Sequence, residues 1–154
     1  MVSSDRIING QNAPSPIPWQ VSLRSCYNSD CHYVYHYCGG TILDSKTILS
    51  AAHCFQNAGT DYTSHYIKAG GTNVFGDQNI KIDQVINHPN YNGQTNDNDV
   101  AILKLSQPLN LGSSAQAICL PSDNFEPADG AKCFVSGWGT LSSGKYPRYV
   151  LNVS

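Results

Sequence analysis

A chain of 154 residues can form one domain, or one domain and part of a second, and can bury a substantial core. Hydrophobic residues make up 40% of the chain and charged residues 13%, while 13 glycines and 8 prolines separate short apolar runs. This composition favours an all-β, turn-rich fold. The net charge of -2, with its lysines and arginines scattered, argues against a nucleic-acid partner. No apolar run reaches the ~20 residues of a transmembrane helix, so no membrane partner is expected.

Strand signals recur along the chain between clusters of Gly, Pro, Asn and Asp. Several short strands at such intervals are typical of a closed barrel. A polar segment, residues 121–130, lies between two apolar stretches and is predicted to link two units. The strands are predicted at residues 20–24, 41–43, 47–51, 65–69, 80–86, 100–105 and 131–136.

Two of these strands carry residues suited to proton transfer. The run TILSAAHC, residues 47–54, places His53 at the end of an apolar strand beside a cysteine that can tie it down. The run NDVAILKL, residues 98–105, places Asp99 at the start of another apolar strand, where a carboxylate can orient an imidazole. Each residue alone also fits a structural role, a packed histidine and a turn cap. Together they predict two members of a nucleophilic triad.

Six cysteines in a chain of this size indicate an oxidising compartment. Two spacings, Cys26-x4-Cys31 and Cys38-x15-Cys54, are loosely compatible with zinc, but no Cys-x2-Cys or His-x3-5-His pair accompanies them. Disulfides are therefore favoured, although six cysteines allow 15 pairings. Residues 1–6 lack the apolar core of a signal peptide, so we expect a secreted protein in fragment or trimmed form.

Eight short motifs follow one another in the order found in a known family. The chain resembles the chymotrypsin and trypsin family of serine endopeptidases through these motifs. The resemblance implies a trypsin-like double β-barrel, with a six-stranded antiparallel barrel over about 20–120 and the start of a second over 131–154. It also implies a protease domain over 7–154, truncated, after an activation-peptide remnant at 1–6. The motifs are RIING (6–10), PWQVSL (18–23), CGGTIL (38–43), SAAHC (50–54), HPNY (88–91), DVAILKL (99–105), ICLP (118–121) and SGWG (136–139).

The resemblance assigns catalytic roles to two residues. His53 would act as general base and then general acid, and Asp99 would fix its tautomer and stabilise the imidazolium. The family's nucleophilic serine lies in a Gly-Asp-Ser-Gly-Gly run, which does not occur in these 154 residues; Ser136 belongs to a strand motif instead. We therefore expect the complete product to be a secreted serine endopeptidase and this chain alone to be inactive. The alternative is a non-catalytic homologue that acts as a binding module.

The same resemblance implies how the protease would be activated and which partners it would bind. Cleavage after Arg6 would free the α-amine of Ile7, which pairs with a carboxylate beside the serine. His36 resembles the histidine that holds that carboxylate in the zymogen, although it fits a satisfied core histidine equally well. The implied partners are polypeptide substrates, an activating protease and protein inhibitors, and we expect a monomer.

The same resemblance implies how the cysteines pair. Cys38 and Cys54 would form the bridge beside the catalytic histidine, and Cys26 and Cys31 would pair locally within a loop insertion. The partners of the other two cysteines would lie outside this chain. No cofactor or metal is expected, because the segment 69–77 offers a single acid where calcium needs six to eight oxygens. The two remaining cysteines are Cys119 and Cys133.

Overall fold

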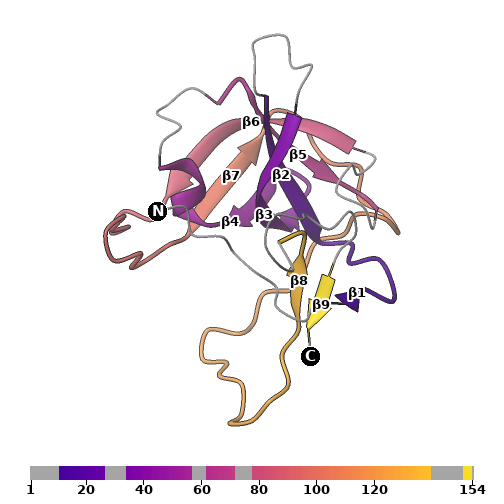
Figure 1. Cartoon of the computed structure of the whole chain (residues 1–154), viewed down its shortest axis with the longest axis vertical. Coiled ribbons are helices and arrows are strands. Elements are labelled where there is room, and N and C mark those ends of the chain that lie inside the picture. Colours follow the sequence, from indigo (N-terminus) through magenta and orange to yellow (C-terminus); the bar gives the residue numbers. More distant parts are fainter. Residues whose placement is uncertain (1–10, 27–33, 57–61, 72–77, 140–150, 154) are drawn as a thin grey trace.

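The computed structural model describes residues 11–26, 34–56, 62–71, 78–139 and 151–153, and strands dominate it (Figure 1). A single turn of 3₁₀ helix, η1, interrupts the strands. The elements in chain order are β1 (Gln11–Asn12), β2 (Gln20–Cys26), β3 (Val34–Asp44), β4 (Thr47–Ser50), η1 (Ala52–Phe55), β5 (His65–Ala69), β6 (Gln78–Asn87), β7 (Ala101–Leu105), β8 (Val135–Gly137) and β9 (Leu151–Val153).

Six strands close into an antiparallel barrel in the order β2-β3-β4-β7-β6-β5. The all-β class and the six-stranded antiparallel barrel expected from the sequence are thereby confirmed. β3 and β6 extend beyond the predicted 41–43 and 80–86, because each pairs with a neighbour along most of its length. Closure leaves none of the six strands with an unpaired edge, which protects the barrel from aggregation through exposed strands.

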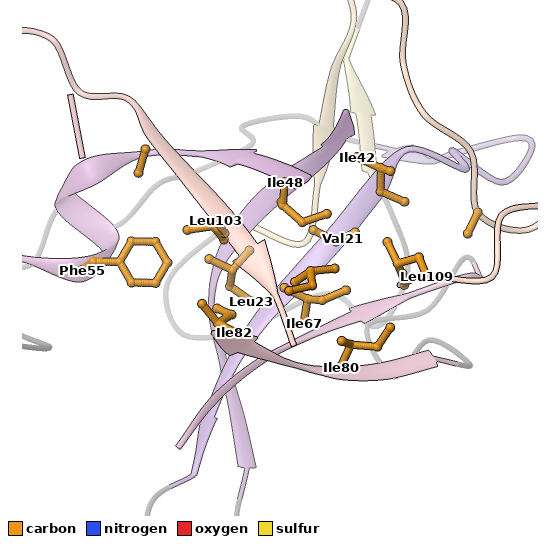
Figure 2. Packing of buried hydrophobic residues seen from close by; sticks show 14 of the residues in the cluster. Val21, Leu23, Ile42, Ile48, Phe55, Ile67, Ile80, Ile82, Leu103 and Leu109 are labelled. Atoms are coloured by element: carbon orange, nitrogen blue, oxygen red, sulfur yellow. The ribbon is translucent and has the colours of Figure 1, made fainter. Parts of the chain in front are cut away.

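Branched aliphatic side chains fill the interior of the barrel (Figure 2). On β2, Val21 and Leu23 point inward and are fully buried, as the period-2 alternation of a strand requires. Ile48 and Leu103, on the paired strands β4 and β7, are also fully buried. Each such side chain contributes about 1.5–3 kcal/mol when removed from water. The core therefore fixes the two strands that lead to His53 and away from Asp99.

One glycine allows β3 to approach the core closely. A Cβ atom on Gly40 would lie 2.8 Å from Cγ2 of Ile48 and 3.0 Å from methyl carbons of Leu23 and Val21. No ordinary side chain fits at that spacing without displacing its neighbours. Glycine in the CGGTIL motif is thus a packing requirement of the barrel.

Outside the barrel, β1, β9 and β8 form a small three-stranded antiparallel sheet. The strand predicted over 131–136 is wrong in its first four residues, since β8 begins only at Val135. Residues 131–134 have no partner strand among the described residues, and Phe134 is 70% exposed. All four residues are exposed, so water satisfies their backbone hydrogen bonds and no strand pairing is required. The predicted linker and the division of the chain into two barrels remain predictions.

Candidate active site

His53 is held by the element that follows β4. β4 ends at Ser50, whose hydroxyl donates to the Gly39 carbonyl at 2.9 Å. The chain then turns into η1, with His53 as its second residue and with Ala52 and Phe55 buried on either side. The sequence predicted a strand up to residue 51, and β4 ends one residue earlier because Ala51 is the extended residue that precedes η1. The two buried neighbours anchor the turn while the histidine side chain stays 37% exposed.

Strand register brings Asp99 to the same place. β4 and β7 are antiparallel, and Ser50 lies opposite Ala101. The residues just after the end of β4 therefore face those just before the start of β7. Asp99, two positions before Ala101, reaches the turn that carries His53 although 46 residues separate the two in sequence. The barrel pairing thus makes neighbours of two motifs that the sequence could only suggest belong together.

The Asp99 carboxylate receives two hydrogen bonds from the same residue. Its Oδ2 lies 2.7 Å from Nδ1 of His53, and its Oδ1 accepts the backbone N–H of His53 at 2.8 Å. Burial raises the pKa of Asp99, but the hydrogen bonds from the His53 backbone and imidazole, with the imidazole's charge, outweigh it and lower the pKa overall. An ionised Asp99 can only accept, so Nδ1 carries the proton and Nε2 of a neutral imidazole presents its lone pair.

A disulfide lies beside the His53 imidazole. Cys38 on β3 is bonded to Cys54, the residue after His53, as the sequence resemblance implied. The Cys54 sulfur lies 3.6 Å from Nε2 of His53. Within the part of the chain that the structure describes, these three residues form the one group whose ligand atoms lie as close as metal ligands do. Metals bind cysteine as thiolate, and both sulfurs are consumed by the disulfide, so this group is a covalent brace as it stands.

Aromatic side chains pack beside this brace, and the sequence analysis did not anticipate them. Tyr37, Phe55, Tyr62 and His65 meet edge to face or tilted, with centroids 5.4 to 6.3 Å apart. The Tyr37 hydroxyl is hydrogen-bonded to Nδ1 of His65 at 2.9 Å. Burial, followed by the neighbouring tyrosines, raises the pKa of Tyr37 beyond its usual range. The cluster joins β3, η1 and β5, and so supports the turn that holds His53.

His36 is partly buried beside Ser22 and Trp138. Its Nδ1 is hydrogen-bonded to the Ser22 hydroxyl at 2.8 Å, and its ring meets the edge of Trp138 at a centroid distance of 5.9 Å. Burial, reinforced by the positive charge of Arg24, lowers the pKa of His36 from 6.5 to about 4. His36 is therefore neutral at physiological pH. The Trp138 contact links the SGWG motif to the barrel.

The other predicted residues are spread around the chain. Ser136 donates its hydroxyl to Oε1 of Gln20 at 2.9 Å, consistent with a structural role. Cys26 is disulfide-bonded, while Cys31, its expected partner, lies outside the described residues. Arg6 and Ile7, the expected activation site, also lie outside them. The remaining predicted residues, Cys119 and Cys133, are free and exposed.

Comparison with known proteins identifies the lineage of this site. The chain matches the family model described as Trypsin over residues 7–154. It is 38% identical over 144 residues to Serine protease 1 of Canis lupus familiaris, covering 90% of this chain and 52% of that protein. Trypsin of Sus scrofa is 37% identical over 150 residues, covering 93% of this chain and 58% of that protein. The chain belongs to the trypsin family of serine proteases.

A solved structure agrees with the sequence relatives. The chain titled "Structure of GrC" matches with a TM-score of 0.80 at 27% identity, covering 96% of this chain and 63% of that one. The resemblance to the chymotrypsin and trypsin family and the trypsin-like fold class are thus confirmed. The chain spans about half the length of the trypsins that it matches. Among the described residues, none of the helical segments is long and apolar enough to cross a bilayer.

Proposed function

We propose that this chain is the N-terminal part of a secreted serine endopeptidase, in which His53 is the proton-transfer base and Asp99 its orienting partner. The observation that supports this most directly is the 2.7 Å contact between Nδ1 of His53 and the Asp99 carboxylate. Family membership supplies the reaction class, hydrolysis of a peptide bond. The nucleophile would come from a segment outside these 154 residues, whose sequence contains no Gly-Asp-Ser-Gly-Gly run.

The geometry supports a defined sequence of proton transfers. Nε2 of neutral His53 would take the hydroxyl proton of the serine as its oxygen attacks the substrate carbonyl carbon. The imidazolium that forms is stabilised by Asp99, whose lowered pKa keeps it ionised throughout. Nε2 would then return the proton to the leaving amine. A water molecule would attack the acyl-enzyme in the second half of the reaction, with His53 again acting as base.

The proposed setting follows from the same assignment. Polypeptides would be the substrates, an activating protease would cut between Arg6 and Ile7, and protein inhibitors would bind at the active site. The disulfide Cys38–Cys54 supports an extracellular location, because such bonds persist in oxidising compartments. We propose a monomer with neither nucleic-acid nor membrane partner and with no cofactor.

A fluorophosphonate probe tests whether the 154-residue chain lacks its nucleophile. Such probes form a covalent bond with activated serines, and we expect no labelling of this chain. Stoichiometric labelling would show that an activated serine lies within it. The two catalytic assignments need a complete site, which a chimera can provide.

The chimera joins residues 1–139 to the part of Sus scrofa trypsin that follows the residue matching Gly139, so that no segment of the domain is left out. After cleavage between Arg6 and Ile7, we expect it to hydrolyse a peptide amide and to lose this activity in the His53→Ala variant. For Asp99→Asn the loss should be about ten-thousand-fold, a figure established for the chymotrypsin-type triad itself rather than worked out from this chain. A folded chimera that binds substrate without cleaving it would favour the non-catalytic binding module. Full activity in the His53→Ala chimera would overturn the assignment of the base.

A further inference from the structure

The direction of the Asp99 side chain is fixed by the backbone on either side of it. Both carboxylate oxygens must face His53, and an aspartate has only two side-chain torsions with which to achieve this. The backbone N–H of Val100 donates to the Asn98 carbonyl at 2.8 Å, closing a three-residue turn with Asp99 at its centre. The Val100 carbonyl in turn accepts the N–H of His88 at 2.8 Å. Asp99 thus projects from a sharp bend instead of from a strand.

The bend depends on an unusual conformation at Asn98. Its φ is 55°, in the left-handed region that costs most residues about 1–2 kcal/mol and that asparagine tolerates better than others. Its side-chain Nδ2 donates to the Asn90 carbonyl at 3.1 Å, which ties the bend to the preceding part of the loop. The Asn98 side chain is exposed, so it buries no apolar surface whose loss would unfold the barrel.

The rest of this loop is held by separate contacts. Asn92 donates its N–H to the Asp97 carbonyl at 3.0 Å and accepts the N–H of Asn96 at 2.8 Å. Asn96 is also left-handed, with φ 59°, but it lies three residues before Asp99. The loop therefore contains two strained asparagines, of which only Asn98 adjoins the carboxylate. This pair makes a matched comparison possible.

We propose that Asn98 is a positioning residue for the His53–Asp99 pair. Its left-handed backbone conformation sets the bend, and its side-chain amide fixes the position of that bend by bonding to the Asn90 carbonyl. Both Asp99 oxygens can then accept hydrogen bonds from His53. The proposal rests on the proposed function for its catalytic meaning. The structural part of the proposal concerns the two hydrogen bonds from His53 to Asp99, and these can be measured without any peptidase activity.

NMR on the full 154-residue chain provides the test, with Asn98→Ala as the main variant and Asn96→Ala as the control. The readouts are the Nδ1 proton signal of His53 and the exchange rate of its backbone amide. In Asn98→Ala we expect the Nδ1 signal to weaken and amide exchange to accelerate about tenfold. Core amides at Ile48 and Leu103 should keep their protection. In Asn96→Ala both His53 readouts should stay within about twofold of the wild-type chain.

Asn98→Gly separates the two contributions, because glycine accepts the left-handed φ but removes the amide donor. It should accelerate exchange of the His53 amide about threefold. Wild-type readouts in Asn98→Ala, or equal losses in Asn96→Ala, would overturn the proposal. If Asn98→Ala unfolds the barrel, Asn98→Gly decides: threefold faster exchange supports the proposal and wild-type signals refute it. An inactive chimera would contradict the proposed function while leaving these signals unchanged.

Discussion

His36 should make the stability of the barrel depend on pH well above the range where carboxylates titrate. Its ring is partly buried against Ser22 and Trp138, and this burial, with the nearby charge of Arg24, lowers its pKa to about 4. In the unfolded chain the pKa returns to about 6.5. At pH values between these two pKa values, His36 is protonated in the unfolded state and neutral in the folded state. The contribution of His36 is therefore complete above pH 6.5 and is lost progressively as the pH falls towards 4.

The size of this loss follows from the shift. A shift of one pKa unit corresponds to about 1.4 kcal/mol, so the full difference is worth about 3 kcal/mol. Between about pH 7 and pH 5, where most carboxylates remain ionised, linkage gives a loss of about 2 kcal/mol. The pKa of Asp99 is also lowered in the folded chain. The contribution of Asp99 to the free energy of unfolding is therefore lost only as the pH falls below the ordinary pKa of a carboxyl group. Restricting the measurement to pH 5 and above therefore keeps most of the carboxylate titration out of it.

Urea denaturation at the two pH values, followed by tryptophan fluorescence, provides the measurement. The wild-type chain should lose about 2 kcal/mol of unfolding free energy between pH 7 and pH 5, and His36→Gln should lose far less over the same interval. His88→Gln, which replaces an exposed histidine, should behave as the wild type. Each chain is compared with itself at two pH values, so a general loss of stability in His36→Gln does not affect the conclusion. An equal loss in His36→Gln and the wild-type chain would refute the reasoning.

Two further predictions concern packing and the thiols. Gly40→Ala should destabilise the chain by about 1–3 kcal/mol, because its Cβ would come within 2.8 Å of a core methyl group. Gly112→Ala, which meets nothing within 4 Å, should change the unfolding free energy by less than about 0.5 kcal/mol, and equal effects in urea denaturation would contradict the packing argument. Iodoacetamide should label Cys119 and Cys133 in the native chain without reductant, as peptide mass spectrometry can establish, since both are free and exposed. A disulfide between these two would rule this out.

Much of the barrel could be predicted because its strands have a local signature. Short apolar runs between turn residues located β2, β4, β5 and β7 to within a few residues. The strand expected over 131–136 formed only from Val135 onward, because a strand also needs a partner, and its apolar residues gave no information about where that partner begins. The very short β1 and β9 were not anticipated, since two or three residues carry no periodicity.

The sequence by itself determined the lineage and the types of residue at the site. SAAHC and DVAILKL marked His53 and Asp99 as a base and a carboxylate, and membership of the trypsin family is now shown. Only the tertiary structure decided that the two residues meet at 2.7 Å, because this distance depends on the register between β4 and β7. The bend at Asn98 was likewise invisible in the sequence, and the structure decided which of two roles open to His36 it has in this chain. Residue chemistry is local, whereas orientation and solvation arise from partners that the fold brings from far along the chain.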